Sequence, residues 1–140
     1  MSEDDVLGPV GFTAAANTTR QYLTYQPLLF QDVRTNIGGA YDDSSSVFTC
    51  PVTGVYVISV SVTSSINQTI TGRIRIEKQT YVLASGDIDP VSQNSGSAMV
   101  VEYCIQGENI WIESGTNEFH ETHGNSPSRS SFSAFLLYPL

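Results

Sequence analysis

The chain is dominated by short stretches in which apolar and polar residues alternate, and it lacks the apolar spacing of an amphipathic helix. The plainest stretch is 54–63, Gly-Val-Tyr-Val-Ile-Ser-Val-Ser-Val-Thr. One of its faces carries four large apolar residues, Tyr56, Ile58, Val60 and Val62. Valines and serines alternate on the opposite face. We predict a β-strand there, with one face in the core and the other partly covered.

Further strands are predicted from the same alternation at 10–15, 25–30, 71–78, 80–84, 97–105, 108–113 and 131–138. Turn-forming residues separate them, and we expect loops in the long polar segments 42–46, 85–95 and 114–129. Many short strands at this spacing predict an all-β sandwich or barrel. The chain shows neither a repeat nor a linker, so we expect an acidic tail at 1–8 and one domain at 9–140.

Several strands carry apolar residues on both faces, which gives more sheet surface than one core can hide. In 97–105 a single face holds Met99, Val101, Tyr103 and Ile105. In 131–138, Phe135 and Leu137 fall opposite a second apolar set, Phe132, Leu136 and Tyr138. The second face of that strand needs a cover, and a second copy of the chain can supply it. If the strand pairs in mid-sheet, truncating it should unfold the domain.

Charge narrows the range of partners. Charged residues make up 14 % of the 140 residues, against about a quarter in typical domains. The formal net charge is −8, from 14 acidic and six basic side chains. Such a domain repels phosphate backbones and anionic headgroups, so we expect no nucleic-acid partner. No apolar run approaches the roughly 20 residues of a membrane span, so no membrane insertion is expected.

The sequence alone does not decide the cellular compartment of the protein or whether its two cysteines form a disulfide. The chain starts with acidic residues and has no secretory leader, which fits either a cytosolic protein or a mature chain whose leader was removed. Cys50 and Cys104 form either one disulfide or two free thiols. Asn17 and Asn67 begin N-glycosylation triplets, which favour secretion.

Residues 30–60 resemble the signature of the complement C1q globular domain, a phenylalanine and aromatic pattern at fixed spacings. Six of its eight positions match: Phe30, Asn36, Tyr41, Phe48, Gly54 and Tyr56. Ile58 and Val60 depart from it, since the family pattern has aromatics there. Residues 10–14, 107–112 and 131–138 also resemble family segments, so the similarity covers about 9–138 in order.

The resemblance implies a ten-stranded jelly-roll β-sandwich of the C1q and tumour-necrosis-factor type that assembles as a homotrimer. It also implies a calcium site in the loop between the fourth and fifth core strands, which here holds Asp87 and Asp89. Carboxylate oxygens suit Ca²⁺. No cofactor is required.

Catalysis is not expected. His120 and His123 are three residues apart in a Gly-, Asn- and Ser-rich segment, whereas the helical zinc motif spaces its histidines by four. We interpret them as solvated loop residues, with a loop-borne zinc site or a pH-sensitive contact as the alternative, and nominate no catalytic group.

Ligand-binding candidates are few on so acidic a chain. Arg73 and Arg75 form the main basic stripe, and Arg129 is an isolated positive point. Tyr22 and Tyr25 can stack on a sugar ring or pack against the first strands. A solvated outer strand face is the alternative for the arginine stripe.

The function expected from these features is a secreted, trimeric pattern-recognition or lectin-like module of innate immunity, without a collagen stem, that binds carbohydrate or a protein ligand through its loops. Two alternatives remain. One is a signalling ligand for a cell-surface receptor, similar to the adipokine and synaptic-organiser members. The other is a structural coat or matrix trimer.

Overall fold

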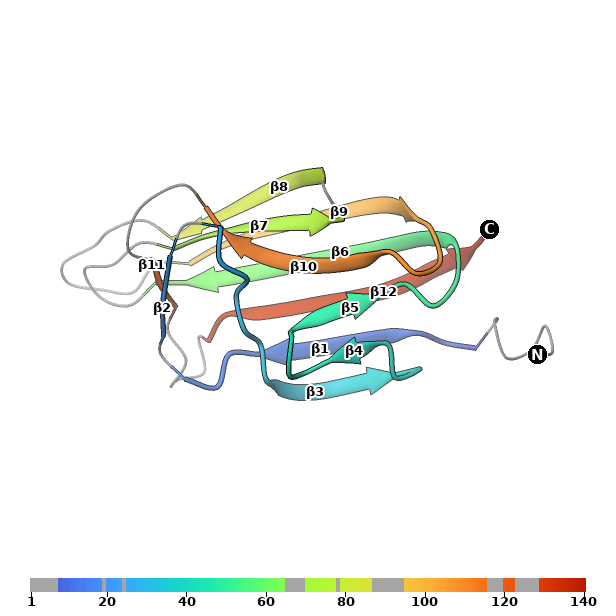
Figure 1. The fold of residues 1–140 in the computed structure, drawn as a ribbon, viewed down its shortest axis with the longest axis horizontal. Helices are drawn as coiled ribbons and strands as arrows, with labels where there is room; N and C mark the ends of the chain where they lie inside the picture. The colour runs from blue at the N-terminus through green and yellow to red at the C-terminus, as the bar shows by residue number, and fades with distance from the viewer. Residues whose placement is uncertain are drawn as a thin grey trace.

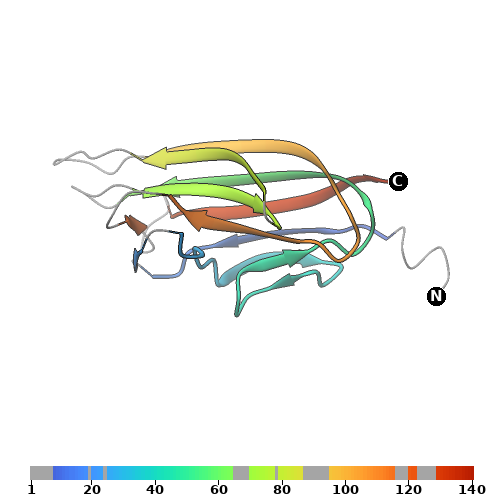
Figure 2. The same ribbon diagram turned by 45° about the horizontal axis from the view of Figure 1, so that its top comes forward.

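The computed structural model describes residues 8–18, 20–23, 25–64, 70–77, 79–86, 95–115, 120–122 and 129–140. Within these ranges the fold is all-β: two five-stranded antiparallel sheets face each other (Figures 1 and 2), and a two-stranded ribbon lies at the end opposite the two termini. None of the described residues forms a helix of the length and hydropathy that crosses a membrane. The predicted jelly-roll sandwich is confirmed.

The first sheet has the order β3–β1–β12–β6–β9, the second β4–β5–β10–β7–β8. The strands of the first sheet are β3 Asp32–Ile37, β1 Gly11–Ala15, β12 Ser131–Pro139, β6 Gly54–Thr63 and β9 Ser95–Cys104. Those of the second are β4 Tyr41–Asp42, β5 Val47–Thr49, β10 Asn109–Ser114, β7 Ile70–Ile76 and β8 Gln79–Gly86. The ribbon pairs β2 Arg20–Tyr22 with β11 His120–Thr122.

The core between the sheets is built from the strand faces that the alternation predicted. In β6 the side chains of Tyr56, Ile58, Val60 and Val62 are buried, while those between them are only half-buried. Aromatic rings fill the centre, where Phe12 stacks on Tyr41 with 4.1 Å between ring centroids. Each sheet therefore also has an outer face.

The predicted strand at 25–30 is wrong. Pro27 has no N–H to donate, and Tyr25 has a positive φ of 61°, which extended backbone does not allow. The segment instead follows the end of β10, where Pro27 forms an isolated bridge with Glu113 and Leu28 N donates to Ile112 O. It is thus a turn laid beside the second sheet.

Strands β2, β3, β4, β5 and β11 were not predicted. Four of the six residues of β3, the edge strand of the first sheet, are exposed, so its sequence lacks apolar alternation. The strand β11 lies inside the predicted loop 114–129 and pairs with β2. Four of these strands have only two or three residues and β3 is an exposed edge strand, so none carries enough alternating apolar positions for a local pattern to show.

The C-terminal strand β12 lies in mid-sheet, between β1 and β6. Phe132 faces the core and Phe135 faces outward, as the alternation indicates. A register shift between Leu136 and Tyr138 then breaks the period of two. Tyr138 therefore lies opposite Val55 and is 49 % exposed, which corrects its predicted place beside Phe132.

A disulfide joins Cys50 and Cys104, whose Cα atoms are 6.6 Å apart, and answers the question that the sequence left open. Cys50 follows β5 of the second sheet and Cys104 ends β9 of the first. The bond therefore ties the two sheets together near one end of the sandwich.

Candidate functional site

The outer face of the first sheet carries exposed apolar side chains in rows that cross three strands. One row is Phe135, Val57 and Val101, and the next is Tyr138, Val55 and Tyr103. Among them Val101 is 52 % and Tyr103 51 % exposed. We call these six residues the apolar face. An apolar surface of this kind is typical of an interface between protomers.

Serines replace the apolar residues further along the same sheet. Ser59 pairs with Met99 and Ser133, and Ser61 pairs with Ser97 and Ser131. Their small side chains leave a shallow hollow of about 300 Å³, lined also by Met99 and Ala98. Small residues alone do not indicate a ligand, so we assign no binding function to this hollow.

The outer face of the second sheet has a different chemistry. Cross-strand pairing places Arg73 opposite Glu113 and Arg75 opposite Trp111. Both arginines reach the same carboxylate oxygen, since Glu113 Oε1 lies 3.6 Å from Arg73 Nη1 and 3.2 Å from Arg75 Nη1. Two guanidiniums thus share one carboxylate.

Two aromatic rings complete this arrangement. The guanidinium carbon of Arg73 lies 4.9 Å from the ring centroid of Tyr25, and that of Arg75 lies 5.7 Å from Trp111. Arg75 Nη2 also donates to Glu77 O, yet its Nε is buried without a hydrogen-bond partner among the residues that the structure describes. We call Tyr25, Arg73, Arg75, Trp111 and Glu113 the arginine–aromatic cluster.

Tyr25 is held in place by its turn. The buried Ser114 hydroxyl donates to Leu23 O and accepts from Gln26 N, and Ser114 N donates to Gln26 O at 2.8 Å. These bonds fix a backbone in which Tyr25 has a positive φ, although the residue is 53 % exposed. An exposed aromatic in a strained, well-anchored conformation suggests a functional surface.

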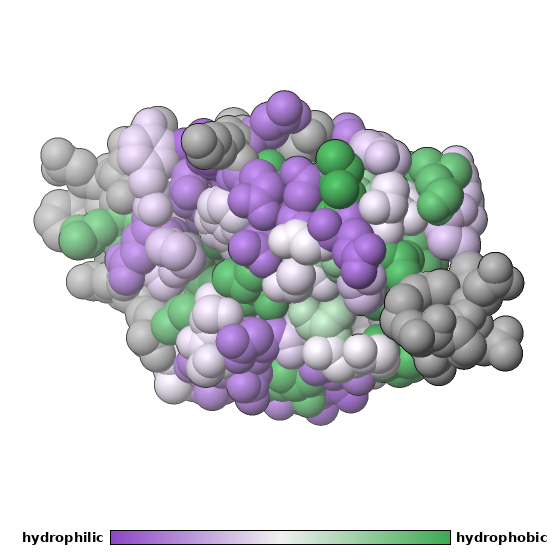
Figure 3. Space-filling view, turned by 45° about the vertical axis from the view of Figure 1, so that its right-hand side comes forward, coloured by the Kyte–Doolittle hydropathy of each residue, from purple (hydrophilic) through white to green (hydrophobic). Residues whose placement is uncertain are grey.

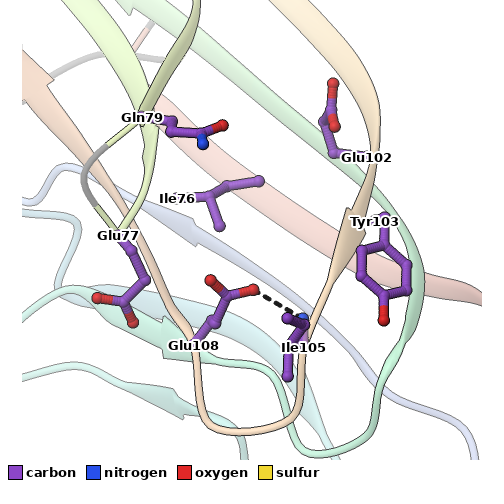
Figure 4. A pocket seen from close by; sticks show the side chains of 7 residues that line it. All are labelled: Ile76, Glu77, Gln79, Glu102, Tyr103, Ile105 and Glu108. Atoms are coloured by element: carbon purple, nitrogen blue, oxygen red, sulfur yellow. Dashed lines mark hydrogen bonds between the residues drawn. The ribbon is translucent and has the colours of Figure 1, made fainter.

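A third feature is an acidic hollow of about 480 Å³ at the open edge between β9 and the β7–β8 turn (Figure 4). Glu77, Glu102 and Glu108 line it together with apolar residues. Glu77 Oε1 accepts from Asn109 N at 2.5 Å and Glu108 Oε1 from Ile105 N at 2.8 Å, so these carboxylates brace the surrounding turns. Among the described residues no group of three acidic, His or Cys side chains could hold a metal ion.

Polar side chains cover much of the face seen in Figure 3, and apolar residues lie there in separate small groups. In Figure 1 the second sheet is the nearer one.

The structure separates the candidates named from the sequence. Arg73 and Arg75 come together in the arginine–aromatic cluster, whereas Tyr22 is buried and its hydroxyl accepts from Leu29 N. Arg129 binds Asp32 at 2.8 Å and donates to Ala16 O, which makes it a bridge to the edge strand β3. That guanidinium lowers the pKa of the Asp32 carboxyl.

The six signature residues have structural environments. Phe30, Phe48 and Tyr56 are fully buried, and Tyr56 Oη donates to Val52 O. Asn36 exchanges side-chain hydrogen bonds with the backbone of Tyr41. At Gly54 a Cβ would lie 2.6 Å from Tyr138 O, so no larger residue fits.

Several candidates lie outside the described residues: Asp87, Asp89, Asn67, His123 and all of segment 1–8 except Gly8. The backbone of His120 is described and pairs with Tyr22, while Asn17 is exposed. Sequence reasoning missed Glu113 and Trp111. The period of two places Trp111 and Glu113 on the same face of their strand. The sequence does not show that this strand pairs with β7 and its arginines.

Comparison with curated proteins finds relatives at 27–31 % identity. Caprin-2 of Danio rerio is 31 % identical over 120 residues, which is 81 % of this chain and 12 % of that protein. A complement C1q subcomponent of Mus musculus is 27 % identical over 128 residues, 91 % of this chain and 50 % of that protein. Complement C1q tumor necrosis factor-related protein 5 of Rattus norvegicus is 27 % identical over 80 % of this chain and 46 % of its own length. The chain therefore spans half or less of these relatives.

Solved structures share the fold. The globular domain of zebrafish complement 1qA protein matches with a TM-score of 0.76 at 20 % identity, covering 94 % of this chain and 99 % of that one. The Eiger TNF of S. frugiperda matches with a TM-score of 0.76 at 13 % identity, covering 95 % of both chains.

The C1q domain family model matches residues 11–137, nearly the whole of the chain. Domains of the C1q and tumour-necrosis-factor families form trimers, bind protein ligands and are not enzymes, and C1q-domain homologues are typically secreted. By this match the chain belongs to the C1q domain family, and its fold agrees.

Proposed function

We propose that this chain is an extracellular, homotrimeric recognition module of innate immunity that binds glycans or related microbial surface patterns. The observation that carries the proposal is the arginine–aromatic cluster, where an exposed Tyr25 ring stands beside hydrogen-bonding arginines on the second sheet. Sugar rings stack on aromatic faces and need polar groups beside them to fix their orientation.

The trimer is supported by the apolar face. Its six residues lie on the first sheet, and the arginine–aromatic cluster lies on the other. A neighbouring protomer that covers the first sheet leaves the cluster open to solvent, so three copies would present three binding surfaces.

Secretion is supported by the disulfide, because such bonds persist in oxidising compartments and are rare in the cytosol. The exposure of Asn17 is compatible with glycosylation there. Mass spectrometry of the protein purified from its native source tests both points: a free thiol at Cys104 would contradict secretion.

A glycan array with the trimeric protein tests the recognition function. We expect binding to a subset of glycans, and loss of at least about tenfold in affinity for the variant Tyr25→Ala, which removes one stacking contact. Leu23→Ala is the matched control, because Leu23 is an exposed residue of the same turn whose side chain has no ring to stack on a sugar. No glycan signal for the wild type, with and without Ca²⁺, would refute the proposal.

A calcium ion bound by Asp87 and Asp89 is a separate proposal that rests on the family resemblance. Binding to the folded state alone raises its stability by mass action. We expect the melting temperature to rise in millimolar Ca²⁺ over EDTA, and Asp87→Asn to abolish the rise. An unchanged wild-type melting temperature would contradict the site.

The second candidate function is a signalling ligand for a protein receptor. The acidic hollow of Figure 4 favours it, because three glutamates beside apolar residues suit a lysine or arginine side chain of a partner. Cross-linking to one cell-surface protein that weakens with Glu102→Gln would favour this function over glycan recognition.

A further inference from the structure

The segment that follows β1 combines an acceptor sequence for N-linked glycans with an exposed position. Residues 17–19 read Asn-Thr-Thr, and the first two of them are exposed and lie outside any strand. The preceding residue is buried and fixed, because Ala16 N donates to Ser130 O at 2.8 Å and Ala16 O accepts from Arg129 Nη1. An anchored backbone therefore presents Asn17 on a surface loop, where a bulky, hydrophilic sugar chain has room.

The other asparagines that the structure describes have structural roles instead. The Asn36 amide donates to Tyr41 O, and the Asn109 side chain accepts from the Thr49 hydroxyl. Neither of them begins an acceptor triplet. The Asn17 side chain has no hydrogen-bond partner among the described residues, so a sugar attached to its amide breaks no such bond of the fold.

Asn17 also lies away from the apolar face. Near the start of β1, Gly11 pairs with Phe135 of the apolar face, whereas Ala15 at its end pairs with Ser131. At about 3.3 Å per residue these two pairs are about 13 Å apart, and Asn17 follows beyond the second pair. Figure 1 shows that β1 runs from the end with the termini toward the opposite end. A glycan on Asn17 therefore leaves the apolar rows open to a neighbouring protomer.

The disulfide is an independent indication of the same route through the cell. N-linked glycans are added in the secretory pathway, where the bond between Cys50 and Cys104 also forms and persists. We propose that Asn17 carries an N-linked glycan at the end of the sandwich opposite the termini, where it is compatible with the trimer. This inference rests on the proposed secretion and adds a covalent modification to it.

The modification is a glycosyl transfer to the Asn17 side chain. The bond formed joins the amide nitrogen, Nδ2, to the first sugar carbon. The bond broken joins that carbon to the diphosphate of a lipid-linked oligosaccharide donor, which leaves with the electron pair, while the nitrogen gives up one proton. Residue 19 supplies the threonine hydroxyl that the acceptor triplet requires.

Peptide mass spectrometry of the protein from its native source tests whether Asn17 is occupied. We expect a glycan on most copies, and an aspartate at position 17 after enzymatic release of the glycan. In chains secreted from a eukaryotic cell line, Thr19→Ala should remove this glycan and Thr19→Ser should keep it, because only serine retains the acceptor hydroxyl. Asn67→Gln is the matched control, since it removes the other triplet and should leave the glycan on Asn17.

Light scattering tests the position of the glycan. The glycosylated protein should be a trimer both before and after enzymatic release, and a monomer that becomes a trimer only after release would contradict the placement. Bare Asn17 in the native protein overturns the inference. If Cys50 and Cys104 are disulfide-bonded in that bare protein, the proposed function still stands. If they are free thiols, the proposed secretion fails together with the glycan.

Discussion

The two outer faces of the sandwich differ in chemistry although both belong to half-buried antiparallel sheets. On the first sheet, Phe135, Val57 and Val101 form an apolar row across β12, β6 and β9. On the second, the equivalent outward positions of β10 and β7 hold Glu113 and two arginines braced by aromatic rings. Burial of the apolar side chains of the first face stabilises a complex, so this face suits a permanent partner. The second keeps directional hydrogen bonds at the surface, so it suits a ligand that comes and goes.

The largest expected effect is the loss of the trimer when the apolar face is made polar. Val101→Asp places a charge at the β9 end of a row that we expect to be covered in the trimer, where an unpaired buried charge is very costly. We expect the solution mass at micromolar concentration to fall from about 46 kDa, three times 15.2 kDa, to about 15 kDa. Light scattering after size exclusion measures it.

Thr49→Asp is the matched control, because Thr49 is exposed on β5 of the second sheet and receives the same charge. Its mass should stay that of the trimer. A trimer that survives Val101→Asp would mean that the apolar face is not the interface.

The disulfide between Cys50 and Cys104 joins the two sheets whose outer faces are compared. Replacing Cys50 and Cys104 by serine opens a loop with a sequence separation of 54, and chain entropy puts the cost at about 4 kcal/mol. Urea unfolding at fixed protein concentration should show this loss. Wild-type protein unfolded with reductant should give the same midpoint as the variant; an unchanged midpoint in both would contradict a stabilising disulfide.

Both faces also rest on one aromatic core, which alkaline pH disturbs. Burial raises the pKa of Tyr41 to about 12, above its ordinary value of 10. The resulting stability is fully present below pH 10 and is lost as the pH rises through 12, because the unfolded chain releases the proton first. The loss is on the order of 3 kcal/mol.

Urea unfolding between pH 9 and 12 should show this decline, and Tyr41→Phe should make it less steep while losing the hydrogen bond to Phe30 O. Burial also raises the pKa of Tyr56, so part of the decline should remain in that variant. Tyr25→Phe is the control, because Tyr25 is half exposed and lies outside the apolar face, and its curve should fall like that of the wild type. A Tyr41→Phe curve that falls as steeply as the wild type would exclude Tyr41 as the source.

Salt should affect ligand binding and trimer formation differently, and this effect is smaller than those above. Raising NaCl from 50 to 300 mM screens charges near the surface but leaves apolar association intact. We expect the trimer mass to stay constant while the affinity for any glycan that binds through charged groups falls by about threefold. Dissociation of the trimer in salt would reverse the assignment of the two faces.

Much of the fold could be predicted from the alternation alone. The strands β6, β7 and β12 each bury one face in a globular core, so the period of two is written in their residues. Strand β3 is an exposed edge strand and β11 has only three residues, so neither shows that period. The bulge that turns Tyr138 outward is equally invisible, because it depends on the register with β6.

For the candidate site, the sequence determined the residue types, and the tertiary structure decided which of them contact one another. Arg73, Arg75 and Tyr25 stand out as a basic stripe and an aromatic whatever the fold. Glu113 lies 38 residues beyond Arg75, and only the β7–β10 register brings it to both guanidiniums. The local pattern likewise shows that Met99, Val101 and Tyr103 share a face, and sheet packing decides that this face lies outside. Side-chain period is a local property of the chain, whereas register and layer packing join residues that are distant in sequence, so only the folded molecule fixes them.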